Sequence, residues 1–417
     1  MRDTLDTAAA QPPVDFDPFS QQVMNDPLPV YERMRRECPV YFSEKYNGYF
    51  FFRFADCFEM LSKVDNSLVQ AESSLPTPEH LTSVHHEGAP PPISREAPIG
   101  MIQTMGMPEH GAARNAHIKP LLPGAATQME RYVRRLANDL LDDLLPRGRF
   151  DLTKEYGGIV APSLVLKLMG IPTEYAARAR DIVNSGTVTD PEKGGFSTFN
   201  AAMASANFYL PYIAVRRAMG ADGTVPIVDG FIKHEFDGRK LEDMEIARQL
   251  NCIFLGGIET VPKVTAHGLM ELAARPDQLD AVRADLEKNA PVVAEEMIRF
   301  CAPAQWFMRT VMKPVTIAGQ DLKPGQRAFF MVASSSRDEA EFKHADQFIW
   351  DRPIHRTLAF GYGMHFCIGV HMARMEVRVM VEEFLRRVPR FHFDMSNAVR
   401  LPSSFQWGWN SLEVVID

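Results

Sequence analysis

The sequence predicts a mainly α-helical fold with a small β portion, and three features support this class. Helix-compatible sequence fills most of residues 125–240, with breaks near Gly148, at Gly170-Ile171-Pro172 and at Gly194-Gly195. A second long helical pattern runs from about 241 to 274. Strand-like sequence occurs only in short runs, so no large sheet is expected.

Two aromatic runs near the N-terminus predict a β-hairpin. Val40-Tyr41-Phe42 and Tyr49-Phe50-Phe51-Phe52 flank Tyr46-Asn47-Gly48, and Asn-Gly is a strong signal for a tight hairpin turn. The other short elements that we expect are helices at 27–37 and 55–63 and strands at 315–319 and 327–332.

Two stretches are expected to be irregular. Residues 1–25 form a poorly periodic arm, in which Pro12, Pro13 and Pro18 disfavour a regular helix. Residues 70–106 are punctuated by prolines, and a loop of this length in a compact domain is usually functional or disordered. We expect it to cover a substrate pocket; a mobile surface loop is the alternative.

Composition limits the class of protein. The chain of 417 residues is 46% hydrophobic and 24% charged, which is typical of a protein with a large core. A net charge of −8 argues against general nucleic-acid binding. Five dispersed cysteines suit a reducing compartment, and no N-terminal apolar run is long enough for a signal peptide or membrane span. We therefore expect a cytoplasmic protein without a membrane anchor.

The middle of the 241–274 pattern has poor helix chemistry. Gly256 and Gly257 each cost about 1 kcal/mol relative to Ala, and an interior Pro262 costs about 3 kcal/mol. Pro262 has no N–H for the carbonyl of Ile258, so the helix is expected to open around residues 256–260. A helix end followed by a new start is the alternative, but apolar helical sequence continues on both sides. An acid beside a hydroxyl at this bend, Glu259-Thr260, suits a proton relay.

One motif combines a cysteine with glycines just before a long helical pattern that continues through Phe384. It reads Phe360-Gly361-Tyr362-Gly363-Met364-His365-Phe366-Cys367-Ile368-Gly369. A helix N-terminus favours a thiolate, and glycines let the backbone approach a flat ligand. The run resembles the haem-binding loop of the cytochrome P450 family, Phe-Gly-x-Gly-x-His-x-Cys-x-Gly, with every fixed position filled. Ala373-Arg374 match the Ala-Arg pair of the following helix.

The resemblance extends over nearly the whole chain and implies one cytochrome P450-like domain spanning 1–417. In that fold a long kinked central helix lies over haem b (iron protoporphyrin IX), and the cysteine loop lies beneath it. Cys367 would be the axial ligand of the iron. Thr260 would face the dioxygen, and Glu259 would supply or orient the proton chain. The residues that would contact the cofactor are His110, Arg114, Gly256, Gly257, Arg309, Phe360, His365 and Gly369.

Further motifs agree with the same family. His110 and Arg114 lie four residues apart, so they share a helix face that suits a carboxylate; alone, such a pair is usually a solvated helix surface. Glu296 and Arg299 match the family's Glu-x-x-Arg pair, with Arg352 as the third member of a structural network. One position departs from the family: Thr357 stands where many relatives have a propionate-binding His, and His355 lies two residues earlier.

The sequence also suggests where a substrate binds, although not which one. The expected pocket residues are Leu255, Gly256, Ala304, Gln305, Phe405 and Gln406, which describe an apolar pocket with a few hydrogen-bonding groups. The cluster Phe208, Tyr209, Tyr212 and Ile213 is either core or the roof of this pocket. The tail Phe405-Gln406-Trp407-Gly408-Trp409 is expected to form a final turn between strands that reaches the pocket.

The resemblance implies a monooxygenase that inserts one atom of O2 into a hydrophobic small molecule, as a monomer. Electrons would come ultimately from NAD(P)H through an external ferredoxin-type donor and its reductase, because the chain contains no flavin or iron–sulfur domain. Arg374, Arg378, Lys119 and Arg114 are the expected docking charges. A peroxide-driven enzyme and a haem-based sensor are the alternatives, and Glu259-Thr260 favours the monooxygenase.

Overall fold

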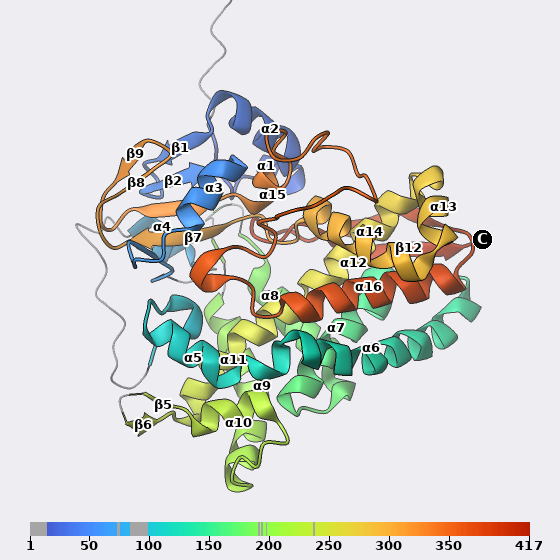
Figure 1. The fold of residues 1–417 in the computed structure, drawn as a ribbon, viewed down its shortest axis with the longest axis horizontal. Coiled ribbons are helices and arrows are strands. Elements are labelled where there is room, and N and C mark those ends of the chain that lie inside the picture. The colour runs from blue at the N-terminus through green and yellow to red at the C-terminus, as the bar shows by residue number, and fades with distance from the viewer. Residues whose placement is uncertain are drawn as a thin grey trace, which may run out of the picture.

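The computed structural model describes residues 15–72, 76–83, 99–190, 192, 195–196, 198–236 and 238–417. Figure 1 shows long helices making up most of the molecule, which confirms the mainly α-helical prediction. The helices are α1 Gln21–Asn25, α2 Pro27–Glu37, α3 Phe54–Leu61, α4 Pro78–Ser83, α5 Glu109–His117, α6 Pro123–Leu144, α7 Gly158–Met169, α8 Ala176–Thr187, α9 Thr198–Ala218, α10 Pro226–Lys233, α11 Asp243–Ile258, α12 Thr260–Ala273, α13 Pro276–Ala284, α14 Leu286–Cys301, α15 Val332–Ser335 and α16 Val370–Arg387.

The strands form small sheets rather than one large one. They are β1 Val40–Ser43, β2 Gly48–Phe51, β3 Leu68–Val69, β4 Arg149–Asp151, β5 Glu235–Phe236, β6 Arg239–Lys240, β7 Phe307–Val311, β8 Val315–Ile317, β9 Gln320–Leu322, β10 Arg327–Phe330, β11 Phe391–Arg400 and β12 Trp409–Ile416. The largest sheet has the order β1-β2-β10-β7-β3. Figure 1 shows β1, β2, β7, β8 and β9 together at the upper left, β5 and β6 at the lower left and β12 beside the helices at the right. The predicted hairpin is confirmed: Val40 pairs with Phe51 and Ser43 with Gly48, around Asn47 at a positive φ of 45°.

The two stretches expected to be irregular contain short helices. Within the described part of the N-terminal arm, α1 covers 21–25, and Phe16 and Phe19 are buried in an aromatic cluster with Tyr31. Residues 15–20 form no regular helix, as expected, but the expectation is wrong for 21–25, which are helical because all three prolines precede them. In the 70–106 stretch, α4 and the 3-10 turn Ile102–Thr104 are ordered. Residues 1–14, 73–75 and 84–98 lie outside the described residues, so for the start of the arm and for about half of the loop the expectation stays a prediction.

The long central helix is interrupted, as predicted, and the interruption lies at a single residue. Glu259 alone separates α11 from α12, while Gly256 and Gly257 remain inside α11. Pro262 becomes the third residue of α12, where its missing N–H has no intrahelical partner to lose. Opening the helix at Glu259 thus accommodates the proline. Gly157 leaves room for it, because a Cβ on Gly157 would lie 3.0 Å from the Cα of Pro262.

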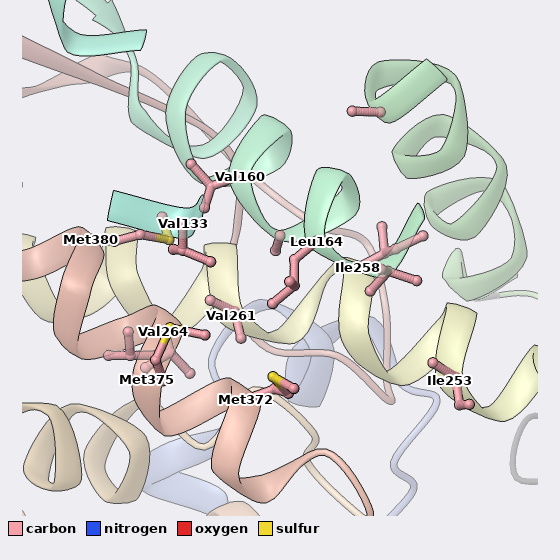
Figure 2. Close-up of a cluster of buried hydrophobic side chains, with 14 of the residues drawn as sticks. Val133, Val160, Leu164, Ile253, Ile258, Val261, Val264, Met372, Met375 and Met380 are labelled. Atoms are coloured by element: carbon pink, nitrogen blue, oxygen red, sulfur yellow. The ribbon is translucent and has the colours of Figure 1, made fainter. Parts of the chain in front are cut away.

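The opened helix lies in the main helical core. Figure 2 shows Val261 and Val264 of α12 among the methionines of α16 and the aliphatic side chains of α7. Phe208 and Tyr209 of α9 are buried against Phe254 of α11, with ring centroids 5.8 Å and 5.5 Å from it. These two aromatic residues are therefore core. In the described part of the chain, no helix has the length and apolarity needed to cross a membrane.

Candidate functional site: a cysteine loop facing an opened helix

The cysteine loop has a defined backbone conformation. It leaves the 3-10 turn Gly363–His365 and enters α16 three residues after Cys367. The Cys367 N–H donates to the carbonyl of Phe360 at 2.9 Å, which closes the loop on itself. Gly363 has φ 69°, and a Cβ there would lie 2.3 Å from the carbonyl oxygen of Leu61, so only glycine fits this position.

The thiol of Cys367 is held in a buried environment. Burial raises its pKa above the usual value, while the backbone N–H of Gly369 and the charges of Arg114 and Arg374 oppose that rise. The sequence predicts a site that favours the thiolate. In the protein without a ligand, however, the effect of burial on the pKa of Cys367 is larger than the opposing effects of Gly369, Arg114 and Arg374, so the neutral thiol is favoured. A bound metal cation supplies the missing positive charge, because coordination deprotonates a thiol.

Four cationic or hydrogen-bonding side chains gather beside this loop. His110 and Arg114 lie on α5, Arg309 lies on β7, and His365 lies in the loop itself. The rings of His110 and His365 are 4.4 Å apart between centroids, edge to face. Burial and the charges of Arg114 and Arg309 lower the pKa of His110 to about 4. The pKa of His365 is lowered well below its usual value, mainly by burial and further by Arg309, His110 and Arg114.

This cluster lacks a negative partner. Among the described residues, no carboxylate forms an ion pair with Arg114 or Arg309, and burial lowers the pKa of Arg309 to about 10. Arg309 donates instead to the amide oxygen of Gln70 at 3.0 Å. The buried Nε2 of His365 has no partner. Such a group of donors fits the carboxylates of a bound anion, as haem propionates would provide.

Residues near the expected position of the missing His have other roles. The hydroxyl of Thr357 accepts from the N–H of Ala359 at 3.1 Å, and His355 is exposed. Phe360 lies under the guanidinium of Arg374, 4.9 Å from its ring centroid. Whether Thr357 or His355 contacts a propionate stays a prediction.

On the opposite side, α11 presents an open surface at Gly256. This glycine is exposed in the last turn of α11, and a Cβ there would meet nothing within 4 Å among the described residues. Gly257 faces the other way, where a Cβ would lie 2.6 Å from Cγ2 of Val165. Gly256 therefore leaves space for a ligand, whereas Gly257 permits close helix packing. The hydroxyl of Thr260 is exposed on this opened side and donates to the carbonyl of Gly256 at 2.8 Å.

Glu259 is placed differently from its neighbour. Its side chain is only 2% exposed and forms an ion pair with Lys263, whose side chain is 1% exposed. The second carboxylate oxygen, Oε1, is buried without a partner. Lys263 is a residue of this region that the sequence motifs do not include, although a Glu and a Lys four residues apart on a helix favour an ion pair.

The Glu296, Arg299 and Arg352 side chains form one buried network. Arg299 donates twice to Glu296, at 2.7 Å each, and Arg352 donates to the same carboxylate at 3.1 and 3.2 Å. The two arginines also bind backbone carbonyls between residues 336 and 347. This fastens the segment that leads to the cysteine loop onto α14.

The residues expected to line a pocket fall into two groups. Leu255 and Phe405 are partly exposed, and Ala304 forms an isolated β-bridge with Gln406. Gln305 is fully buried, and its amide accepts from Tyr31 at 2.8 Å and donates to the carbonyl of Ser403 at 3.3 Å. These hydrogen bonds indicate a structural role for Gln305, because they occupy the amide oxygen and the amide nitrogen that a ligand would otherwise bind.

Two of the four predicted docking charges, Arg374 and Arg378, are held in ion pairs. Arg374 pairs with Glu295 and Arg378 pairs with Glu130, each at 2.6 Å. These surface pairs reduce the positive potential that a partner would meet at α16.

Comparisons with known proteins agree on one family. A family model described as Cytochrome P450 matches residues 195–413. "Putative cytochrome P450 123" of Mycobacterium tuberculosis is 28% identical over 410 residues, covering 97% of this chain and 98% of that protein. "Steroid C26-monooxygenase" of Mycolicibacterium smegmatis is 29% identical over 286 residues, covering 67% and 70%. The solved cytochrome P450 PksS of Bacillus subtilis has a similar fold, with TM-score 0.80 at 21% identity, covering 97% and 100%.

The cysteine loop, the opened helix over it and these matches define a haem-thiolate monooxygenase. The chain belongs to the cytochrome P450 family. It inserts one oxygen atom from O2 into a hydrophobic small molecule, with electrons from an external redox partner.

Proposed function

We propose that Cys367 is the axial haem ligand and that His110, Arg114, Arg309 and His365 bind the haem propionates. The observation that supports this assignment is the cluster of two arginines and two histidines beside the closed cysteine loop, in which neither arginine has a carboxylate partner among the described residues. When bound, the haem supplies the activation of O2. Phe360 and Gly369 would shape the loop around it, and Gly256 would admit it beneath α11.

The protein residues would then orient water and hold a proton on the side of α11. The exposed hydroxyl of Thr260 lies on the open surface, so it is the group that would position water near the reacting oxygen. Glu259 is next to it in the chain but is held by Lys263, so we propose that it acts as the buried acceptor and donor behind Thr260.

We further propose that the enzyme acts as a monomer on an apolar substrate held near Leu255, Gly256 and Phe405. The electrons would come from NAD(P)H through a ferredoxin-type donor and its reductase. We also propose that the protein is cytoplasmic and that residues 70–106 cover the substrate pocket.

The test starts from the ligand. Freshly purified wild-type protein should give the reduced carbon-monoxide band of a thiolate-ligated haem, and Cys367→Ser should lose it. Loss of the band in the wild type would refute the assignment. Arg114→Leu and Arg309→Leu should each weaken haem retention. Arg378→Leu, which removes a partly exposed ion pair with Glu130, is the matched control.

The substrate is approached by a spectral titration with a panel of terpenoid, aromatic and steroid compounds. Steroids belong in the panel because a relative carries the name steroid C26-monooxygenase. Thr260→Ala tests the mechanism: a monooxygenase should lose the coupling of electrons to product and release peroxide. A peroxide-driven enzyme should keep its activity, and a sensor should keep its ligand affinity.

A further inference from the structure

A stripe of charged and titratable side chains follows one side of the opened helix. Glu259, Lys263, His267, Glu271 and Arg275 lie four residues apart, from the break before α12 to just past its end. Side chains at this spacing are neighbours on a helix surface. The stripe covers about 18 Å from Glu259 to Glu271, at about 1.5 Å per residue.

The inner end of the stripe is sealed from solvent. Lys263 donates to the carboxylate of Glu259 and approaches its carbonyl oxygen at 3.4 Å. The backbone of Gly408 covers the lysine, because a Cβ on Gly408 would lie 2.9 Å from the lysine Cβ. The inner pair is therefore held in place by the turn between β11 and β12.

The outer end opens gradually toward water. The side chain of His267 is 4% exposed and lies 3.4 Å from Glu271, which is 16% exposed. Glu271 also pairs with Arg275, which is 33% exposed, at 2.5 Å. Exposure thus rises in sequence order along the outer half of the stripe.

His267 has the chemistry of a relay group. Its Nδ1 is buried without a hydrogen-bond partner, as is Oε1 of Glu259. Burial lowers the pKa of His267, Glu271 opposes that shift, and Arg400 and Arg337 add to it. A neutral imidazole can accept a proton on one nitrogen while it releases one from the other.

We infer that Lys263 and His267 are the inner steps of a proton path that enters beside Glu271 and ends at Glu259, behind Thr260. The inference rests on the proposed function of Glu259 and Thr260. Monooxygenation reduces one oxygen atom to water and so takes up protons from solvent. Only protons move along the stripe, and the electrons come from the external donor. Lys263 and His267 are one helical turn apart, a span that one water molecule bridges.

Three side chains frame the path on its open side: Trp407 and Arg337, which are buried, and Arg400, which is half-buried. The ring of Trp407 lies 5.0 Å from that of His267, and Arg400 and Arg337 lie over the same indole. The indole N–H of Trp407 is buried without a partner. The N–H groups of Trp407, Arg400 and Arg337 offer hydrogen-bond donors to water in the path, and the positive charges of the two arginines disfavour protonation of His267.

The test compares His267→Gln with Thr265→Val in the haem-loaded enzyme. Thr265 lies on the same helix, is equally buried and also has an unpartnered polar atom, but it is not in the stripe. His267→Gln should lower the rate of coupled product formation by about tenfold or more, divert electrons to peroxide and increase the solvent deuterium isotope effect. Substrate affinity and the reduced carbon-monoxide band should not change. Thr265→Val should leave all of these properties unchanged.

A second measurement does not depend on turnover. Exchange of the imidazole C2 proton for deuterium, followed by mass spectrometry, should be faster at His267 than at His117. Both histidines are buried to a similar degree, 3% and 2% exposed, but the Nδ1–H of His117 donates to the carbonyl of Ala113, whereas Nδ1 of His267 has no hydrogen-bond partner among the described residues. Equal protection of the two histidines would argue that no water reaches His267.

The outcomes separate the path from the function on which it rests. If Thr260→Ala fails to uncouple the enzyme, the proposed role of the acid–alcohol pair is wrong. If Thr260→Ala uncouples it while His267→Gln behaves like Thr265→Val, the acid–alcohol pair stands and the path is refuted. Uncoupling by both Thr260→Ala and His267→Gln, with faster exchange at His267, supports the path.

Discussion

Removing the charge of Lys263 should destabilise the protein strongly. Lys263→Met keeps an unbranched side chain under Gly408 but leaves the Glu259 carboxylate buried without its partner. Oε1 of Glu259 already has no hydrogen-bond partner among the described residues, so none of these residues is in position to replace the lysine. Breaking a buried pair in this way costs about 3–5 kcal/mol in the free energy of unfolding.

A double-mutant cycle separates this charge effect from packing. Glu259→Gln alone should also be costly, because it leaves the lysine unpaired. The double variant Glu259→Gln/Lys263→Met removes both charges and should come within about 1–2 kcal/mol of the wild type.

The assay is urea unfolding of the haem-loaded proteins, followed by far-ultraviolet circular dichroism at constant pH. Additive effects of the two substitutions would contradict the argument, because they would mean that the two groups do not interact. A cost below about 1 kcal/mol for Lys263→Met would show that the pair is solvated in solution.

Three further outcomes follow from the same structure. Gly157→Ala should lower the free energy of unfolding by about 1–3 kcal/mol in the same urea assay, because the added Cβ would contact the opened helix. The control is Gly124→Ala, whose added Cβ would meet nothing within 4 Å among the described residues. It should be neutral or raise the free energy of unfolding by up to about 1 kcal/mol. Burial lowers the pKa of His117 to about 4, so its neutral form is favoured in the folded state and stability is lost as the pH falls from 6.5 to 4. His117→Leu should therefore reduce the acid-induced loss by about 3 kcal/mol, measured as the difference from wild type in urea titrations at pH 7 and pH 4. Arg299→Lys should lower the free energy of unfolding by at least about 2 kcal/mol, and with it the thermal midpoint and haem retention. The reason is that lysine cannot donate twice to Glu296 and also reach the carbonyls beyond it. A thermal midpoint within error of the wild type would contradict this.

Local signals in the sequence were sufficient for most of the elements and for the cysteine loop. Asn47-Gly48 predicts the hairpin because few residues accept a positive φ, and the structure has φ 45° at Asn47. Pro262 predicts an interrupted helix because its ring excludes a normal interior turn, and the break occurs at Glu259. The spacing of the loop around Cys367 predicts the family, which the comparisons show.

Contacts between distant segments decided the rest, because no local pattern contains them. The sequence indicates that Glu259 neighbours Thr260, but only packing under Gly408 buries its pair with Lys263. The sequence alone predicts that Gln305 lines a pocket. Its hydrogen bond with Tyr31, 274 positions away in the chain, indicates a structural role instead.

The candidate site shows the same division. Its residue types were readable in the chain, including Arg114, Arg309 and Cys367. That the two arginines share a buried region without a carboxylate partner, among the described residues, follows only from the fold. The physical reason is that hydrogen-bonding capacity belongs to a residue type, whereas burial and charge balance depend on which segments the fold brings together.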